Sequence, residues 1–152
     1  MAQAARATGW SAERSGDPVA LARVRHADGE VARLAGDLDA AVAAFTEARS
    51  LIQDRPDAPT PFAALVHASL ARVTGSSELH EQAVTLARQS RDPAVQGAVL
   101  EGYAEWHARE GDVERAATLL GEAQALRGIT STADPEVRAL AERVSELRRA
   151  AD

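Results

Sequence analysis

Residues 36–51 read GDLDAAVAAFTEARSL, and residues 111–126 read GDVERAATLLGEAQAL. When Gly36 is aligned with Gly111, alanine recurs at the sixth and thirteenth residues of both stretches, and a large apolar residue recurs between them. Glycine permits a tight turn, and the aspartate that follows it is a good helix N-cap. The repeated stretch therefore predicts a chain built from helix–turn–helix units.

The same helical periodicity continues on both sides of these stretches, and no segment alternates like a half-buried strand. Gly and Pro residues separate the predicted helices, which cover approximately residues 18–35, 38–52, 62–73, 79–90, 93–106, 113–126 and 136–150. In the first of them the pattern predicts a buried face made of Leu21, Val24, Ala27, Val31 and Leu34. In the middle unit, an alignment on alanine requires about three extra residues between Gly75 and Ala83.

The spacing divides the chain into three parts. Residues 1–17 form an N-terminal segment with a short helix and Trp10, residues 18–128 form about three helix pairs, and residues 129–152 form a C-terminal capping helix. The predicted fold is all-α, with antiparallel helix pairs stacked as a solenoid of about seven or eight helices. The Arg- and Glu-rich last helix is interpreted as a solubilising cap.

The order Gly, Ala, bulky residue, Ala resembles the tetratricopeptide repeat, which has about 34 residues per unit. Leu100, Tyr103, Ala104 and His107 also fall on consensus positions of that family. The resemblance spans roughly residues 18–128 and implies a right-handed solenoid whose concave groove is lined by the first helix of each pair. The groove positions that it implies are Arg23, His26, Glu30, Arg33, Phe62, Leu65, Ser69, Arg72, Ala98, Glu101, Glu105 and Arg109.

A narrower resemblance lies near the C-terminus. Residues 119–128, followed by Asp134-Pro135-Glu136-Val137, resemble the tail of the helical-repeat region of large actinobacterial transcriptional regulators of the antibiotic-regulatory type. This resemblance implies a regulatory module that receives a signal or a partner. The DNA-binding and nucleotide-hydrolysing domains of those regulators have no counterpart in this sequence.

Composition excludes several classes of site. The formal net charge is −6, which argues against a direct nucleic-acid surface. All 17 basic residues are arginine, so a phosphate-binding loop that needs lysine is excluded. This usage is typical of a GC-rich bacterial genome. The absence of cysteine excludes disulfides and thiolate metal sites.

No pattern of catalytic or metal-ligating residues is present. The four histidines, His26, His67, His80 and His107, are widely spread, and none forms an i, i+4 pair. Glu101, Glu105 and Arg109 share one helix face, either as a charged patch of the groove or as a solvated stripe of ion pairs. We therefore expect no enzyme activity, no metal and no cofactor.

The sequence is thus interpreted as a non-enzymatic protein–protein interaction or signal-sensing module of a bacterial regulator or adaptor. The expected partner is a protein, a peptide or a neighbouring domain, and we expect a cytoplasmic chain with no membrane contact, monomeric or weakly dimeric. An arginine of the groove can pair with a partner's carboxylate. The alternative is a regulatory domain that binds a small molecule between its helices, which an internal apolar cavity would favour.

Overall fold

The computed structural model describes residues 14, 16–128 and 134–152, so Trp10 and the predicted N-terminal helix lie outside the described residues. The described residues contain seven α-helices and no strand. The helices are α2 (Pro18–Leu34), α3 (Leu38–Ile52), α4 (Thr60–Thr74), α5 (Ser77–Ser90), α6 (Pro93–Arg109), α7 (Val113–Arg127) and α9 (Pro135–Ala151). The prediction of an all-α fold is confirmed.

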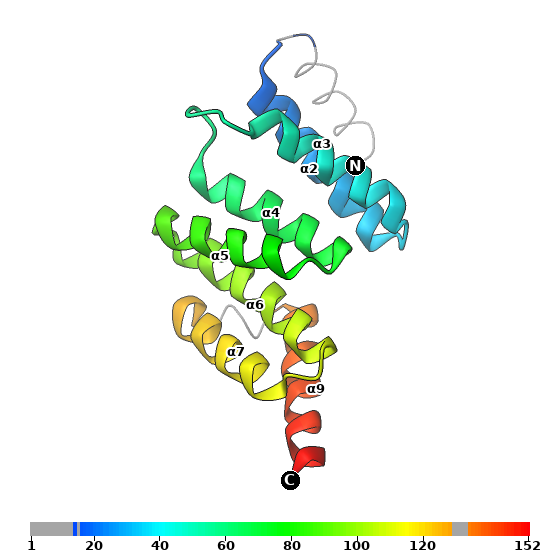
Figure 1. Ribbon diagram of the computed structural model, residues 1–152, viewed down its shortest axis with the longest axis vertical. Coiled ribbons are helices and arrows are strands. Elements are labelled where there is room, and N and C mark those ends of the chain that lie inside the picture. Colours follow the sequence, from blue (N-terminus) through cyan, green and yellow to red (C-terminus); the bar gives the residue numbers. More distant parts are fainter. Residues whose placement is uncertain (1–13, 15, 129–133) are drawn as a thin grey trace.

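Consecutive helices form three pairs, in which α2 packs on α3, α4 on α5 and α6 on α7. Figure 1 shows these pairs stacked one after another along the long axis of the molecule. Neighbouring pairs meet because α4 contacts both α3 and α6, and α5 contacts α6. Helix α9 lies at the end of the stack against α7 and α6, where Val144 is buried in the core between those two helices.

Each pair is joined by the same turn. Gly36, Gly75 and Gly111 have φ of 81°, 71° and 88°, in the left-handed region that glycine adopts without strain. The next residue caps the second helix, through Asp37 in the first pair and Ser76 in the second, whose side chains accept backbone N–H groups. The short turn lets the two helices fold back and pack on each other, which produces the antiparallel pairs.

The alignment of the first and last pairs is confirmed by burial. Ala41, Ala116, Ala48 and Ala123 are all completely buried. Between them Phe45 is completely buried and Leu120, at the corresponding place, is 5 % exposed. Alanine therefore stands where two helices cross closely, and the larger residue fills the space beside the crossing.

The middle pair corrects one prediction. It contains no three-residue insertion, because α5 begins two residues after Gly75, as α3 begins two residues after Gly36. His80 occupies the place of Ala41 and Ala116 and is only 1 % exposed. The alignment on Ala83 failed because a histidine holds the position at which alanine was expected.

The predicted buried face of α2 was also wrong. Val31 and Leu34 are each 69 % exposed, whereas Ala22 and Gly29 are buried. The reason lies in the partner helix, since the large ring of Phe45 packs against Gly29 and leaves no room for a side chain there. Because glycine has no apolar side chain, the spacing of apolar residues did not identify Gly29 as buried. It predicted burial of Val31 and Leu34 instead.

Gly29→Ala should therefore destabilise the protein. In an open helix the same change is stabilising by about 1 kcal/mol, but here the new methyl group overlaps the Phe45 ring, and overpacking of this kind costs about 1–3 kcal/mol. Urea denaturation followed by circular dichroism measures the change.

The last pair supplies the matched control. The residues that correspond to Gly29 and Phe45 there are Ala104 and Leu120, and both are buried. The double variant Gly29→Ala/Phe45→Leu reproduces that combination and should recover most of the stability lost by Gly29→Ala. A stabilising effect of Gly29→Ala alone would contradict the packing described here.

Candidate functional site

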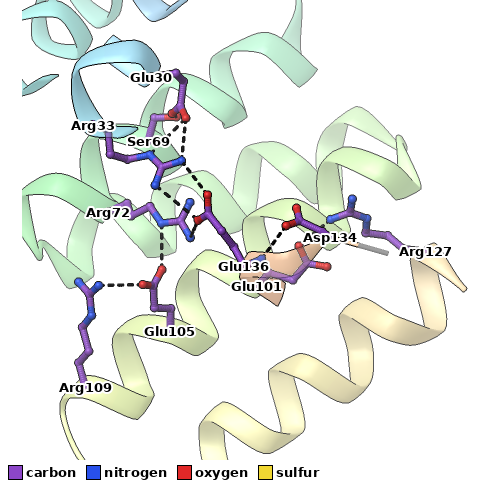
Figure 2. A network of polar contacts seen from close by, with 10 residues as sticks. All are labelled: Glu30, Arg33, Ser69, Arg72, Glu101, Glu105, Arg109, Arg127, Asp134 and Glu136. Carbon is purple, nitrogen blue, oxygen red and sulfur yellow. Dashed lines mark hydrogen bonds and ion pairs between the residues drawn. The ribbon is translucent and has the colours of Figure 1, made fainter. Parts of the chain in front are cut away.

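The groove side chains come from corresponding positions of the first helix of each pair. Arg33 of α2 and Arg72 of α4 each stand three residues before the turn glycine. Glu30, Ser69 and Glu105 each stand six residues before it. Because the pairs stack in the same orientation, these positions lie on one face, as Figure 2 shows. The structure thus brings together most of the groove residues predicted from the sequence.

Polar contacts link α2 to α4 at one end of this face. The hydroxyl of Ser69 donates a hydrogen bond to Glu30 Oε1 at 3.0 Å and lies 2.9 Å from His26 Nε2. Glu30 Oε2 in turn accepts from Arg33 at 3.1 Å. Burial lowers the pKa of the Arg33 guanidinium, but the carboxylates of Glu30 and Glu136 outweigh that effect and raise the pKa. The guanidinium is thereby held in place and charged.

The contacts continue from α4 to α6. Arg72 Nε donates to Glu105 Oε2 at 2.9 Å, and Arg109 Nη2 donates to Glu105 Oε1 at 2.8 Å. Glu105 is 20 % exposed and Arg109 is 56 % exposed. The predicted stripe on α6 is therefore partly an internal ion-pair network and partly a solvated edge.

The network also contains a residue that the sequence analysis missed. Glu136, in the first turn of α9, reaches the groove and contacts both arginines (Figure 2). Arg33 lies 3.4 Å from Glu136 Oε1 and 3.5 Å from its Oε2, and Arg72 Nη2 lies 3.1 Å from Oε2. The prediction that α9 is only a solubilising cap was incomplete. The acidic start Asp134-Pro135-Glu136 beside an arginine-lined groove was the available signal.

Glu101 makes its ion pair with a residue outside the predicted stripe on α6. It is 8 % exposed and pairs with Arg127 of α7 at 2.6 Å between Nη1 and Oε2. Arg127 reaches it by packing across Gly97, where a Cβ atom would overlap the arginine side chain. Burial raises the pKa of Glu101 despite the opposing charge of Arg127. Its Oε1 atom is buried and has no hydrogen-bond partner among the described residues.

Phe62 and Leu65, the two large apolar residues among the predicted groove positions, are not exposed as a groove would require. Phe62 is 7 % exposed and belongs to the core between α2, α3 and α4, where it packs with Ala48 and Val66. Arg23 covers its ring at 4.6 Å from the ring centroid. Leu65 is half-buried against the core between α4 and α5. Burial was underestimated because Phe62 faces a core shared with α2 and α3, and Leu65 faces a core shared with α5 and α6.

A cavity of about 480 Å³ lies beside the network, within the range of ligand sites in proteins. Its walls carry both charges, from Arg72, Arg127 and Arg143 and from Glu101 and Glu105. In the part of the chain that the structure describes, no three His, Asp or Glu side chains gather as metal ligands. Ala98 lines this cavity as well. The site is therefore suited to charged organic groups.

No protein-family model matches the chain, and a search of curated proteins finds no match. The resemblances to tetratricopeptide repeats and to actinobacterial regulators therefore stay predictions. None of the described helices combines the length and the hydropathy that a membrane crossing needs.

Each histidine has a pKa below 6.5, chiefly because burial disfavours the charged imidazole. The largest effect is at His80, whose pKa falls to about 4. Its ring stacks on Tyr103 with centroids 5.3 Å apart, and its Nδ1 atom has no partner among the described residues. His107 packs against the same tyrosine and lies 3.6 Å from Asp112.

We predict that His80 makes the protein less stable in acid. Between pH 6.5 and pH 4 the unfolded state binds a proton at this histidine and the folded state does not, so stability is lost as the pH falls through that interval. The loss approaches roughly 3 kcal/mol. His80→Leu, which cannot titrate, should lose less in urea denaturation over the same interval. Equal losses in the two proteins would disprove the role of His80.

Proposed function

We propose that this chain is a non-catalytic interaction module whose groove holds an acidic segment of a protein partner or of a neighbouring domain. One observation carries the proposal. Arg33 and Arg72, on two separate helix pairs, converge on a single carboxylate that comes from outside those pairs. Guanidinium groups are well suited to carboxylates because their N–H donors match both oxygens.

The remaining groove contacts support binding rather than chemistry. Glu30, which accepts a hydrogen bond from Ser69, holds Arg33, and Glu105 holds Arg72, so the cationic groups are oriented before a partner arrives. Preorganised side chains lose less conformational entropy on binding. The exposed Arg109 at the end of the network offers a further contact to a partner.

The wider role remains part of the proposal. A cytoplasmic bacterial regulator or adaptor is supported by the likeness of residues 119–128 and 134–137 to the helical-repeat tail of actinobacterial regulators. In such a protein a groove for acidic segments would receive a partner or a signal from another domain. A stack of helix pairs, with a continuous face lined by corresponding residues, is suited to this task.

Charge reversal tests the groove. A short glutamate-rich peptide labelled with fluorescein should bind with an affinity that weakens as salt is added, whereas its glutamine-rich counterpart should not bind. Arg72→Glu/Arg109→Glu should weaken binding of the glutamate-rich peptide at least tenfold in fluorescence anisotropy, because attraction becomes repulsion.

The matched control is Arg88→Glu, an exposed arginine of α5 outside the network. It should leave the affinity unchanged, and circular dichroism should show that all variants keep their helices. Equal affinity of Arg72→Glu/Arg109→Glu and the unaltered chain would show that the groove does not bind acidic segments.

A second candidate function rests on a separate cleft. This open cleft of about 650 Å³ is lined by helices α3, α4 and α5. Its apolar residues are Ile52, Ala63 and Leu86, and its polar residues include Arg49, His67 and Glu78. Concave sites that combine apolar walls with polar groups are typical of small-molecule binding. This cleft supports the alternative of a regulatory domain that binds a small molecule.

The uncharged dye Nile red can probe this cleft. The unaltered chain should increase its fluorescence, and Ala63→Trp should remove the increase because the indole fills the cleft. Ala125→Trp, at an exposed position of α7, is the control and should retain the increase. If Ala63→Trp is as bright as the unaltered chain, the cleft is not the binding site.

A further inference from the structure

The guanidinium groups of Arg33 and Arg72 converge at one place in the groove, which we call the Arg33–Arg72 subsite. It is occupied by a residue of the chain itself, Glu136. Both oxygens of Glu136 face guanidinium nitrogens, at distances of 3.1 to 3.5 Å. The residues involved come from α2, α4 and α9, so the contact joins the first two helix pairs to the C-terminal helix (Figure 2). The ion pairs are separate from the packing of Leu140 and Val144 of α9, which join the core between α6 and α7.

An apolar stripe is the main attachment of α9. Val137 and Val144 are 7 % and 3 % exposed, and Leu140 packs against the core between α6 and α7. At the far end of α9, Arg148 Nε lies 3.1 Å from Glu114 of α7. The helix can therefore stay seated on α7 while its first turn gives up the arginines.

The ion pairs of Glu136 are exchangeable. Its side chain is 48 % exposed, and Arg72 is 30 % exposed, so water and salt weaken their attraction. By contrast, Arg33 is 16 % exposed and is fixed by Glu30. The subsite is thus permanent, whereas its present occupant is held loosely enough for another carboxylate to replace it.

The occupant also has a defined shape. Asp134 caps α9 by accepting the backbone N–H of Glu136, and Pro135 stands at the first helical position. Glu136 therefore projects from the first turn of a helix that begins Asp-Pro-Glu. The cavity of about 480 Å³ beside it leaves room for further groups of an incoming segment.

We propose that Glu136 is an internal ligand of the Arg33–Arg72 subsite, and that the partner is a protein segment that presents a carboxylate from the first turn of a helix and displaces it. This inference rests on the proposed function and adds both the chemistry of the partner and a means of regulation. While Glu136 occupies the subsite, only the fraction of molecules in which it has left can bind the partner, which lowers the apparent affinity.

The test uses the full chain and a short fluorescein-labelled peptide that begins Asp-Pro-Glu and is rich in glutamate. Glu136→Gln keeps the size and cap of α9 but removes the charge that competes. We expect it to raise the affinity for this peptide about threefold to tenfold in fluorescence anisotropy. Glu142→Gln, an exposed glutamate on the same helix, is the matched control and should leave the affinity unchanged.

The subsite is tested in the same series. Adding Arg72→Gln to Glu136→Gln should abolish the gain, because the guanidinium that receives the peptide is then missing. Circular dichroism and urea denaturation of each variant check that its helices and its stability are retained.

The outcomes are distinct. A gain with Glu136→Gln that is absent with Glu142→Gln supports the internal ligand. Equal, measurable affinities of the unaltered chain and Glu136→Gln would overturn it and leave the proposed function intact. The absence of peptide binding to both proteins would overturn the proposed function and, with it, the internal ligand.

Discussion

The close crossing of the two helices in each pair is the constraint on which the rest of this structure depends. At the crossing Ala41 and Ala116 are completely buried, and no larger side chain fits without a change around it. Phe45 is accommodated because Gly29 faces it. In the middle pair His80 takes the corresponding place. Burial there disfavours the charged imidazole and lowers its pKa to about 4.

The crossing also decides where the groove residues lie. Once the small residues of a pair are in contact, the rotation of its first helix is fixed. The residues one and four positions after the crossing residue, such as Glu30 and Arg33 after Gly29, then lie on the adjoining side, which faces the groove. Arg33 and Arg72 converge because they occupy the same position in two successive pairs. In the third pair that position is Ala108, which is buried, so α6 contributes the carboxylate of Glu105 instead. The groove therefore carries arginines from the first two pairs and a glutamate from the third, because equivalent repeat positions hold different residues.

Burial separates two kinds of ion pair in this region. Glu101 and Arg127 are 9 % and 20 % exposed at their side chains, so removing either one leaves a poorly solvated charge. Their pairing links α6 to α7. The pairs around Glu136 are more exposed and are individually weak. Under the proposed function, a partner competes with the second kind and not with the first.

The sequence by itself determined the helices, their turns and the repeat of the first and last pairs, because Gly, Pro, capping residues and apolar spacing act locally. Several residues that it placed on one groove face, among them Glu30, Arg33, Ser69, Arg72 and Glu105, are joined by polar contacts in the structure. The buried face of α2, the register of the middle pair and the place of Glu136 were decided only by tertiary structure. Each depends on a contact between distant residues: a ring against Gly29, a histidine at an alanine position, and a carboxylate that meets two arginines far away along the chain. The spacing of residues within one helix cannot predict such contacts, because they depend on how distant helices pack.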